Sequence, residues 1–244
     1  MIRTLFVWCS IVVATIVLSL LALILYPFDR SGRRGHALAR VWAKTILWAS
    51  GVKVEIGGLD RLERKGPYIF MSNHQGAYDI FALASALPIH FKWLAKKELF
   101  AIPILGQGMR LAGYIPIDRE GTRETVKEMN EAAAKIRDGM SVVIFPEGSR
   151  SEDGSLQPFK KGGFSLAIKS GVPIVPIAIH GSREIMPKGR WTVRPGRIRI
   201  QIGDPVETGL YTIKDRRGLM DRVSQVISKQ FETVSSPGSN EGHG

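Results

Sequence analysis

Residues 68–84 read Tyr68-Ile69-Phe70-Met71-Ser72-Asn73-His74-Gln75-Gly76-Ala77-Tyr78-Asp79-Ile80-Phe81-Ala82-Leu83-Ala84, and they predict the unit from which the fold is built. The first four residues form an apolar run that matches a buried strand, and residues 80–84 match the buried face of a helix. A polar loop joins the two. Because loops that connect buried elements commonly carry function, we expect this loop to hold the reaction centre.

Short apolar runs continue to alternate with helical stretches after Gly51. Strands are predicted at residues 52–56, 68–71, 93–95, 114–117, 142–145, 174–179 and 198–202. A helix is predicted at residues 122–137 with Thr122 as its N-cap, and another begins at Thr212, where Asp215 completes a capping-box-like start. This alternation is typical of an α/β fold, here a mixed, largely parallel sheet flanked by helices.

The N-terminal segment is the most apolar part of the chain. Residues 5–27 contain no charged side chain, and a bilayer span needs about 20 such residues. A cleaved signal peptide would have a shorter apolar core followed by small residues, whereas Tyr26-Pro27-Phe28-Asp29 follows here. We therefore expect a retained, membrane-embedded helical element.

Cationic residues on either side of this segment predict its orientation. Arg3 precedes it, and the residues that follow are Arg30, Arg33, Arg34, Arg40 and Lys44. The positive-inside bias places the rest of the chain on the cytoplasmic face. Residues 36–50 fit equally well a helix lying in the membrane interface and an amphipathic core helix. If that helix is interfacial, residues 5–27 could enter one leaflet without crossing, and the sequence leaves both arrangements open.

Three parts of the chain follow from these patterns. Residues 1–50 are expected to form a membrane anchor with an interfacial helix, and residues 51–234 the α/β domain. Residues 235–244 are small and polar, so we expect a disordered tail.

Charge and composition limit the classes of function. The formal net charge of +12 predicts attraction to nucleic acid, an anionic bilayer or a phosphorylated substrate. Cys9 is the only cysteine, which excludes a disulfide framework within the chain and a cysteine cluster for zinc. We find no P-loop, no G-x-S-x-G motif and no dinucleotide fingerprint. One group of arginines fits both contact with lipid headgroups and a solvated strand face: Arg190, Arg194, Arg197 and Arg199.

The loop after the predicted strand at residues 68–71 contains a histidine and a carboxylate five positions apart. On one continuous helix they would lie about 140° apart, so a His74–Asp79 pair requires a helix start between them. Gly76 permits a turn there, which places Asp79 in the first helical turn. An aspartate that accepts from one imidazole nitrogen leaves the other able to take a proton from a hydroxyl. Taken alone, the pair also fits a structural histidine at a helix start.

A second polar loop, Phe145-Pro146-Glu147-Gly148-Ser149-Arg150, follows the predicted strand at residues 142–145. Glu147 can accept hydrogen bonds from hydroxyls, and the guanidinium of Arg150 suits an oxyanion. A turn with a surface ion pair is the alternative for this loop and for Asp118-Arg119. Two basic pairs, which also fit solvated surface, complete the set: Lys96-Lys97 and Lys160-Lys161.

Together these segments resemble the motifs of the glycerolipid acyltransferases, specifically the 1-acylglycerol-3-phosphate (lysophosphatidate) acyltransferases. Residues 74–79 resemble their His-x4-Asp motif, residues 113–119 their second motif and residues 172–177 their fourth. Residues 145–150 resemble their Phe-Pro-Glu-Gly-Thr-Arg motif, with Ser149 where threonine is usual, which keeps the hydroxyl. The order and spacing of all four agree over the middle half of the chain.

The resemblance implies acyl transfer from a thioester to the sn-2 hydroxyl of 1-acylglycerol 3-phosphate, which yields phosphatidic acid. It implies that His74 is the general base and that Asp79 orients it. The acceptor phosphate would be bound by Arg119 and Arg150 with Lys97. The remaining substrate-binding residues would be Glu147, Gly148 and Ser149, the first two positioning the glycerol, and the fourth motif would shape the acyl pocket.

The resemblance also implies the partners of the protein. These are membrane lipids, including lysophosphatidate and anionic phospholipid, and a donor that is either acyl-CoA or acyl carrier protein, with no other cofactor and no metal. Two alternatives remain open at this stage. One is the same reaction on glycerol 3-phosphate or a lyso-ornithine lipid, and the other is a membrane-anchored basic protein that binds without catalysis. Nucleic acid is not expected, because the chain has no helix-turn-helix signature, aromatic RNA-binding motif or metal finger.

Overall fold

The computed structural model describes residues 2–29, 32–62, 66–117 and 123–235. Within these ranges seven strands form one sheet in the order β1-β7-β6-β2-β5-β3-β4. The strands are β1 Val52–Gly57, β2 Ile69–Ser72, β3 Phe91–Lys96, β4 Ile115–Ile117, β5 Ser141–Ile144, β6 Ile174–His180 and β7 Gly196–Ile202. Every predicted strand is present, with ends that differ by at most two residues.

Neighbouring strands of the sheet run parallel, apart from the antiparallel pair β6 and β7. The predicted fold class, α/β with a mixed and largely parallel sheet, is confirmed. β2 lies in the interior of the sheet, between β5 and β6. Ligands of such sheets bind at the carboxyl ends of the strands, so the loop that follows β2 begins at a position suited to function.

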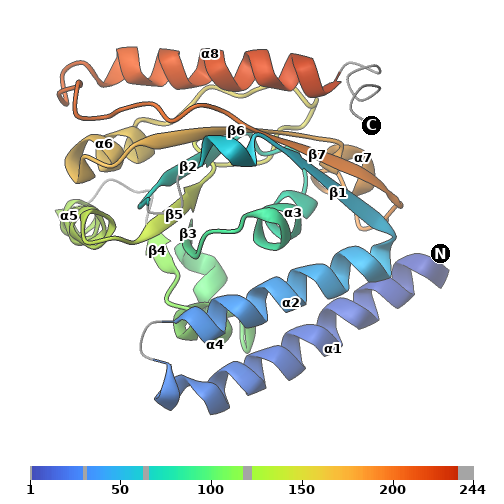
Figure 1. Cartoon of the computed structure of the whole chain (residues 1–244). Helices are drawn as coiled ribbons and strands as arrows, with labels where there is room; N and C mark the ends of the chain where they lie inside the picture. The colour runs from blue at the N-terminus through green and yellow to red at the C-terminus, as the bar shows by residue number, and fades with distance from the viewer. Residues whose placement is uncertain (1, 30–31, 63–65, 118–122, 236–244) are drawn as a thin grey trace.

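Helices cover both faces of the sheet (Figure 1). The helices α5 Arg123–Arg137, α6 Lys161–Ser170 and α8 Arg216–Ser235 cover one face, and α2 Arg33–Ser50 and α3 Tyr78–Ala86 cover the other. Successive side chains of β2 divide between the two: Ile69 and Met71 belong to the core beneath α6 and α8, and Phe70 to the core beside α2 and α3. Burial on both faces explains why this strand has a continuous apolar sequence.

The first helix, α1 Ile2–Leu25, lies against α2 at the base of the molecule (Figure 1). The segment Ile2–Phe28 is the one described helix that is long and apolar enough to cross a membrane. Most of its large apolar side chains are exposed, including Leu5, Val13 and Leu20. Such an exposed apolar surface indicates association with a membrane.

Of the two interpretations left open for residues 36–50, the structure supports the amphipathic core helix, and the position of this helix in a membrane interface stays a prediction. α2 buries Ala43, Ile46 and Leu47 against the core, as an amphipathic core helix does. It also exposes Val41 and Trp48, of which Trp48 is 78% exposed, and it packs against α1 along its length. α2 therefore joins the membrane-associated helix to the α/β domain.

One helix start differs from the prediction. The hydroxyl of Thr212 donates to Asp215 Oδ2 at 2.6 Å, but this bond closes a turn, and α8 begins only at Arg216. The capping-box pattern was misleading here because the same pair stabilises an isolated turn. Thr122, the predicted N-cap of α5, lies outside the described residues, as do residues 236–244 of the predicted tail.

Candidate active site

Loops that follow β2, β5 and β6 meet at the carboxyl ends of these strands. The first loop is fixed by Asn73, whose side chain accepts from Ile179 N at 2.7 Å and donates to Ile179 O at 2.8 Å. The backbone of the second loop donates to the first, from Ser151 N to His74 O at 2.8 Å. Gly76 lies so close to the third loop that a Cβ atom would stand 2.5 Å from Ser182 O. The position after His74 and Gln75 therefore requires glycine.

His74 and Asp79 form the hydrogen-bonded pair that their spacing allows. Helix α3 begins at Tyr78, so Asp79 lies in its first turn, as predicted. The Oδ2 atom of this buried carboxylate lies 2.7 Å from His74 Nδ1 and accepts from Gln75 N at 2.8 Å and Gly76 N at 3.0 Å. Because that oxygen accepts backbone N–H groups, it acts as the acceptor for His74 Nδ1–H as well. The Nε2 atom of His74 is then the nitrogen that can accept a proton.

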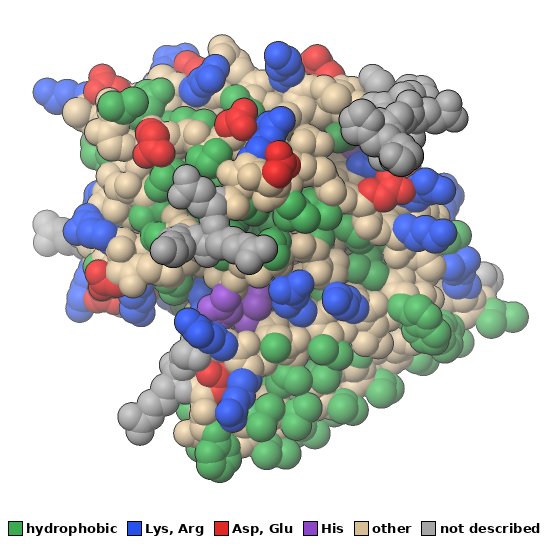
Figure 2. Space-filling view, in the orientation of Figure 1, with side chains coloured by type: hydrophobic (Ala, Val, Ile, Leu, Met, Phe, Trp, Pro, Cys, Tyr) green, Lys and Arg blue, Asp and Glu red, His purple; other side chains and the backbone are tan. Residues whose placement is uncertain are grey.

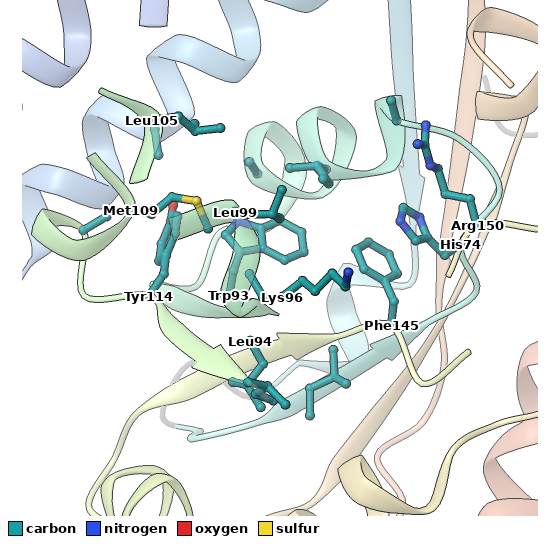
Figure 3. A pocket seen from close by; sticks show the side chains of 18 of the residues that line it. His74, Trp93, Leu94, Lys96, Leu99, Leu105, Met109, Tyr114, Phe145 and Arg150 are labelled. Carbon is teal, nitrogen blue, oxygen red and sulfur yellow. The ribbon is translucent and has the colours of Figure 1, made fainter. Parts of the chain in front are cut away.

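Aromatic side chains hold the imidazole ring in place. The ring of His74 stacks on Phe145 with centroids 3.9 Å apart, and Trp93 stacks on the other side of Phe145 at 5.7 Å. Figure 3 shows these three rings in a row, with the side chain of Lys96 reaching toward Phe145. The His74 side chain is 14% exposed, so it can meet a ligand while its orientation is fixed from two directions.

Glu147 lies behind the loop of His74 and not in the cavity. Its side chain is buried, Oε1 accepts from His74 N at 2.8 Å, and Oε2 accepts from Gln157 N at 3.3 Å. Burial raises the pKa of the Glu147 carboxyl to about 7, against the hydrogen bonds from these two backbone groups, which lower it. The structure therefore brings Glu147 to the histidine backbone and does not bring it to the space where a glycerol group would bind.

The loop after β5 turns at Gly148, whose φ of +78° favours glycine. The side chain of Lys160 passes directly over this glycine, because a Cβ atom at position 148 would lie 2.9 Å from Lys160 Cε. Lys160 N also donates to Pro146 O at 2.8 Å. Ser149, Arg150 and Lys160 thereby reach the same cavity as His74.

The cavity has a volume of about 1250 Å³ and is mostly apolar. It extends from His74 beneath α1 and α2, where Leu18 and Trp42 line it. Leu105 and Met109, both from α4 Leu105–Leu111, line the end away from His74 (Figure 3). Within the part of the chain that is described, no residue of β6 lines the cavity, so the fourth motif builds the sheet beside it. The shape suits a molecule with a long apolar chain and a polar end near His74.

Five described cationic side chains line the cavity: Lys96, Arg150, Lys160, Lys188 and Arg190. Lys97, predicted from the sequence, is not among them, because the side chains of consecutive residues point in different directions at the end of β3. Arg119 lies outside the described residues. Among residues with described side chains, no group of three or more histidines, cysteines or carboxylates is placed to hold a metal ion.

Sequence reasoning missed Lys188 and undervalued Lys160 and Arg190. Lys160-Lys161 was noted only as a basic pair. The signal for Lys160 was Gly148, because a residue without a Cβ atom leaves room for a long side chain to cross the loop. Arg190 was grouped with Arg197, but the structure separates them. Arg197 pairs with Glu55 at 3.0 Å on the β1–β7 surface, as a solvated strand face would, whereas Arg190 lines the cavity.

Comparison with known proteins shows the family of this chain. A family model described as Acyltransferase matches residues 53–180. The chain is 38% identical to the chloroplastic 1-acyl-sn-glycerol-3-phosphate acyltransferase of Brassica napus over 80% of this chain and 58% of the relative, which is less than two thirds of its length. It is 36% identical to the 1-acyl-sn-glycerol-3-phosphate acyltransferase of Limnanthes alba over 95% of this chain and 83% of the relative. The crystal structure of the 1-acyl-sn-glycerophosphate acyltransferase PlsC from Thermotoga maritima covers 98% of this chain and 97% of its own, with a TM-score of 0.84 and 25% identity.

Proposed function

Because this chain belongs to the acyltransferase family, among the 1-acyl-sn-glycerol-3-phosphate acyltransferases, we propose that it transfers an acyl group from a thioester to the sn-2 hydroxyl of lysophosphatidate and forms phosphatidic acid. The observation that supports this activity best is the bond of 2.7 Å between His74 Nδ1 and Asp79 Oδ2 at the wall of an apolar cavity. That arrangement is one general base beside a space for a lipid chain.

In the proposed reaction His74 Nε2 takes the proton of the acceptor hydroxyl as its oxygen attacks the thioester carbonyl carbon. The tetrahedral intermediate expels the thiolate, which receives the proton from the imidazolium. An ester bond forms, a thioester bond breaks, and the histidine returns to its starting state. Asp79 stabilises the positive charge that the imidazole carries between these steps, and no side chain of the protein is acylated.

The phosphate of the acceptor is assigned to the cations nearest His74. Arg150 lines the cavity, and its planar guanidinium can bind two phosphate oxygens at once. Lys160 crosses Gly148 beside it and adds a second charge. We keep Arg119 as a phosphate-binding residue because of its motif. Lys96, which lines the cavity, replaces Lys97 as the predicted phosphate-binding lysine. The acyl chains occupy the apolar part beneath α1 and α2.

The contacts of α1, which is about 36 Å long at 1.5 Å per residue, support a proposal for its place in the membrane. Its start is held to the domain by Arg3, which donates to Ser50 O at 2.8 Å, and its middle by Thr15, which accepts from Trp42 Nε1 at 3.0 Å. Ser19 lies against Gly108 of α4. Because a helix that crosses a bilayer must leave the domain, we place α1 along one leaflet, with the domain on the cytoplasmic side that the charge bias indicates.

A purified-enzyme assay tests the function. Wild-type protein in mixed micelles with lysophosphatidate should release free thiol from acyl-CoA or acyl-ACP, and the preferred thioester identifies the donor. His74→Ala should lower kcat by about a thousandfold or more, since a general base and its charge partner are lost together. His180→Ala removes a histidine at the opposite side of the sheet, which contacts Phe231 of α8, and should retain activity.

Two results would contradict the proposal. Near-normal activity of the His74→Ala enzyme would show that His74 is not the general base. Transfer to glycerol 3-phosphate or a lyso-ornithine lipid in preference to lysophosphatidate would show that the proposed acceptor is wrong. Assays with each acceptor and one donor separate these outcomes.

A further inference from the structure

The loop formed by residues 186–191 follows β6 and α7 Ser182–Ile185 and lies beside the loop of His74. Pro187 forms an antiparallel bridge with Gly76, two residues from His74. Lys188 Nζ pairs with Glu152 Oε1 at 2.8 Å, which joins the segment to the loop after β5. The start of the segment is thus fixed to both loops that build the reaction centre.

The other end of this segment is fixed to the membrane-associated helix. Trp8 of α1 donates from Nε1 to Trp191 O at 2.9 Å, and the two indole rings lie 5.3 Å apart. Two residues further on, Val193 N donates to Thr4 Oγ1 of α1 at 3.4 Å. Trp191 itself is 73% exposed next to the apolar face of α1, and tryptophan is enriched at the level of lipid headgroups. The segment therefore runs from the membrane surface to the reaction centre.

The charges of this segment face the cavity along that route. Lys188, Gly189, Arg190 and Trp191 all line the cavity, together with Trp8 from α1. Arg190 forms no ion pair with a carboxylate of the described residues, whereas Arg197 and Arg199 on β7 both pair with Glu55. Figure 2 shows apolar side chains gathered along the base of the molecule, where Figure 1 places α1. Arg190 is exposed, whereas Arg150 is partly buried, so Arg190 is placed to meet an anionic lipid group that enters from solvent before Arg150 does.

From these contacts we infer that Arg190, on the segment that the Lys188–Glu152 pair holds beside the reaction centre, forms a capture site for the phosphate of the incoming acceptor lipid at the mouth of the cavity, held at membrane level by the Trp8–Trp191 contact. The inference rests on the proposed function, since it assigns a phosphomonoester headgroup to this site. It separates capture at the mouth from binding during the reaction beside His74. Capture by Arg190 affects how readily the lipid enters, and Arg150 holds it during transfer.

Arg190→Ala tests the capture site, and Arg194→Ala is the matched control. Both changes remove one arginine charge from the same connection, but Arg194 does not line the cavity. In micelles of uncharged detergent, Arg190→Ala should raise the KM for lysophosphatidate by about three- to tenfold with little change in kcat, as expected for the loss of a charged contact in a partly exposed site. Arg190→Lys should recover part of the loss, and Arg194→Ala should behave as wild type.

Each alternative outcome has a distinct signature. Equal KM values for Arg190→Ala and Arg194→Ala would overturn the inference, and so would a fall in kcat at unchanged KM. If the defect occurs only on vesicles that contain anionic phospholipid and not in uncharged micelles, Arg190 serves general membrane attraction and the capture site is wrong. A wild-type enzyme that does not acylate lysophosphatidate would contradict the proposed function instead. Far-ultraviolet circular dichroism shows whether each variant is folded, and Arg190→Lys provides the comparison if Arg190→Ala is not.

Discussion

Replacing Glu147 by glutamine tests how the histidine loop is positioned. Both carboxylate oxygens of Glu147 accept backbone N–H groups, from His74 and from Gln157, and the side chain does not line the cavity. Glutamine offers one oxygen and one N–H₂ group, so one backbone donor then faces another donor. An unsatisfied buried group costs about 1–3 kcal/mol. If the loop relaxes to relieve this cost and displaces His74, kcat should fall by about fivefold to a hundredfold, since 1.4 kcal/mol corresponds to about tenfold.

The pH dependence gives the same prediction a second measurement. Burial raises the pKa of Glu147 to about 7 from its usual value near 4.5. Above pH 7 the carboxyl is ionised and both oxygens accept hydrogen bonds, so the advantage of the wild type over Glu147→Gln is greatest. As the pH falls below 7 the wild-type carboxyl gains a proton and resembles the amide, so the ratio of the two kcat values should decrease. The assay is initial-rate acyl transfer at saturating lysophosphatidate between pH 6 and pH 8.5.

The contribution of Glu147 to folding stability decreases as the pH rises, whereas its contribution to kcat increases. The reason is that its pKa is higher in the folded state than in the unfolded state. Unfolded chains hold Glu147 ionised above about pH 4.5, so its contribution becomes unfavourable to folding as the pH rises from there to about 7. At pH 8 the wild type must bury an ionised carboxylate, and Glu147→Gln avoids this cost. The variant should therefore lose less stability at pH 8 than the loss of one hydrogen bond alone would cause. Glu184→Gln, which changes an exposed glutamate of α7, is the control. A raised KM for the acceptor with normal kcat would refute the argument, since Glu147 would then contact substrate, and so would a kcat ratio that is constant with pH.

Three further substitutions test the same loop. Asp79→Asn keeps the volume but removes the charge that stabilises imidazolium, and we expect kcat to fall by about a hundredfold to ten-thousandfold at unchanged KM in steady-state assays. Asn73→Ala leaves the backbone N–H and C=O of Ile179 in buried β6 without their partner, so chemical denaturation should show that the free energy of unfolding falls by about 2–4 kcal/mol. A fall below about 1 kcal/mol would contradict the role of Asn73 in holding the loop to β6. Gly76→Ala places a Cβ atom 2.5 Å from Ser182 O, so thermal unfolding should show a lower Tm and the assay a lower kcat; an unchanged Tm and kcat would mean that this contact does not hold the loop.

The parts of the fold that were predictable from sequence depend on local patterns. Residues 69–71 of β2 are apolar because both faces of the strand are buried, and the apolar run at residues 68–71 was visible without any tertiary information. The helix start between His74 and Asp79 was required by their spacing alone. In each case the sequence signal lies within about ten residues along the chain.

The parts that were not predictable depend on contacts between distant segments. Glu147 approaches the backbone of His74, 73 residues earlier in the chain, and its motif contains no signal of which way the carboxylate points. The choice between Lys96 and Lys97 depends on where β3 ends, and a shift of one residue moves a side chain to the other face. Arg190 gained a role only when Trp191 was found against Trp8, 183 residues away.

The same distinction explains why the sequence left the arrangement of α1 undecided. One side of this helix, at Thr15, Leu18 and Ser19, closes the cavity, and the other side exposes apolar residues such as Val13 and Leu20. A helix that lines an acyl cavity on one side and meets lipid on the other is apolar all round, which is also the composition of a helix that spans a bilayer. Composition therefore cannot separate the two arrangements, whereas contacts with the domain along the helix support the proposed one, in which α1 lies along one leaflet. Because α1 lines the cavity and also exposes apolar side chains, the proposed function lets a lipid pass along this helix to His74 without leaving an apolar surface.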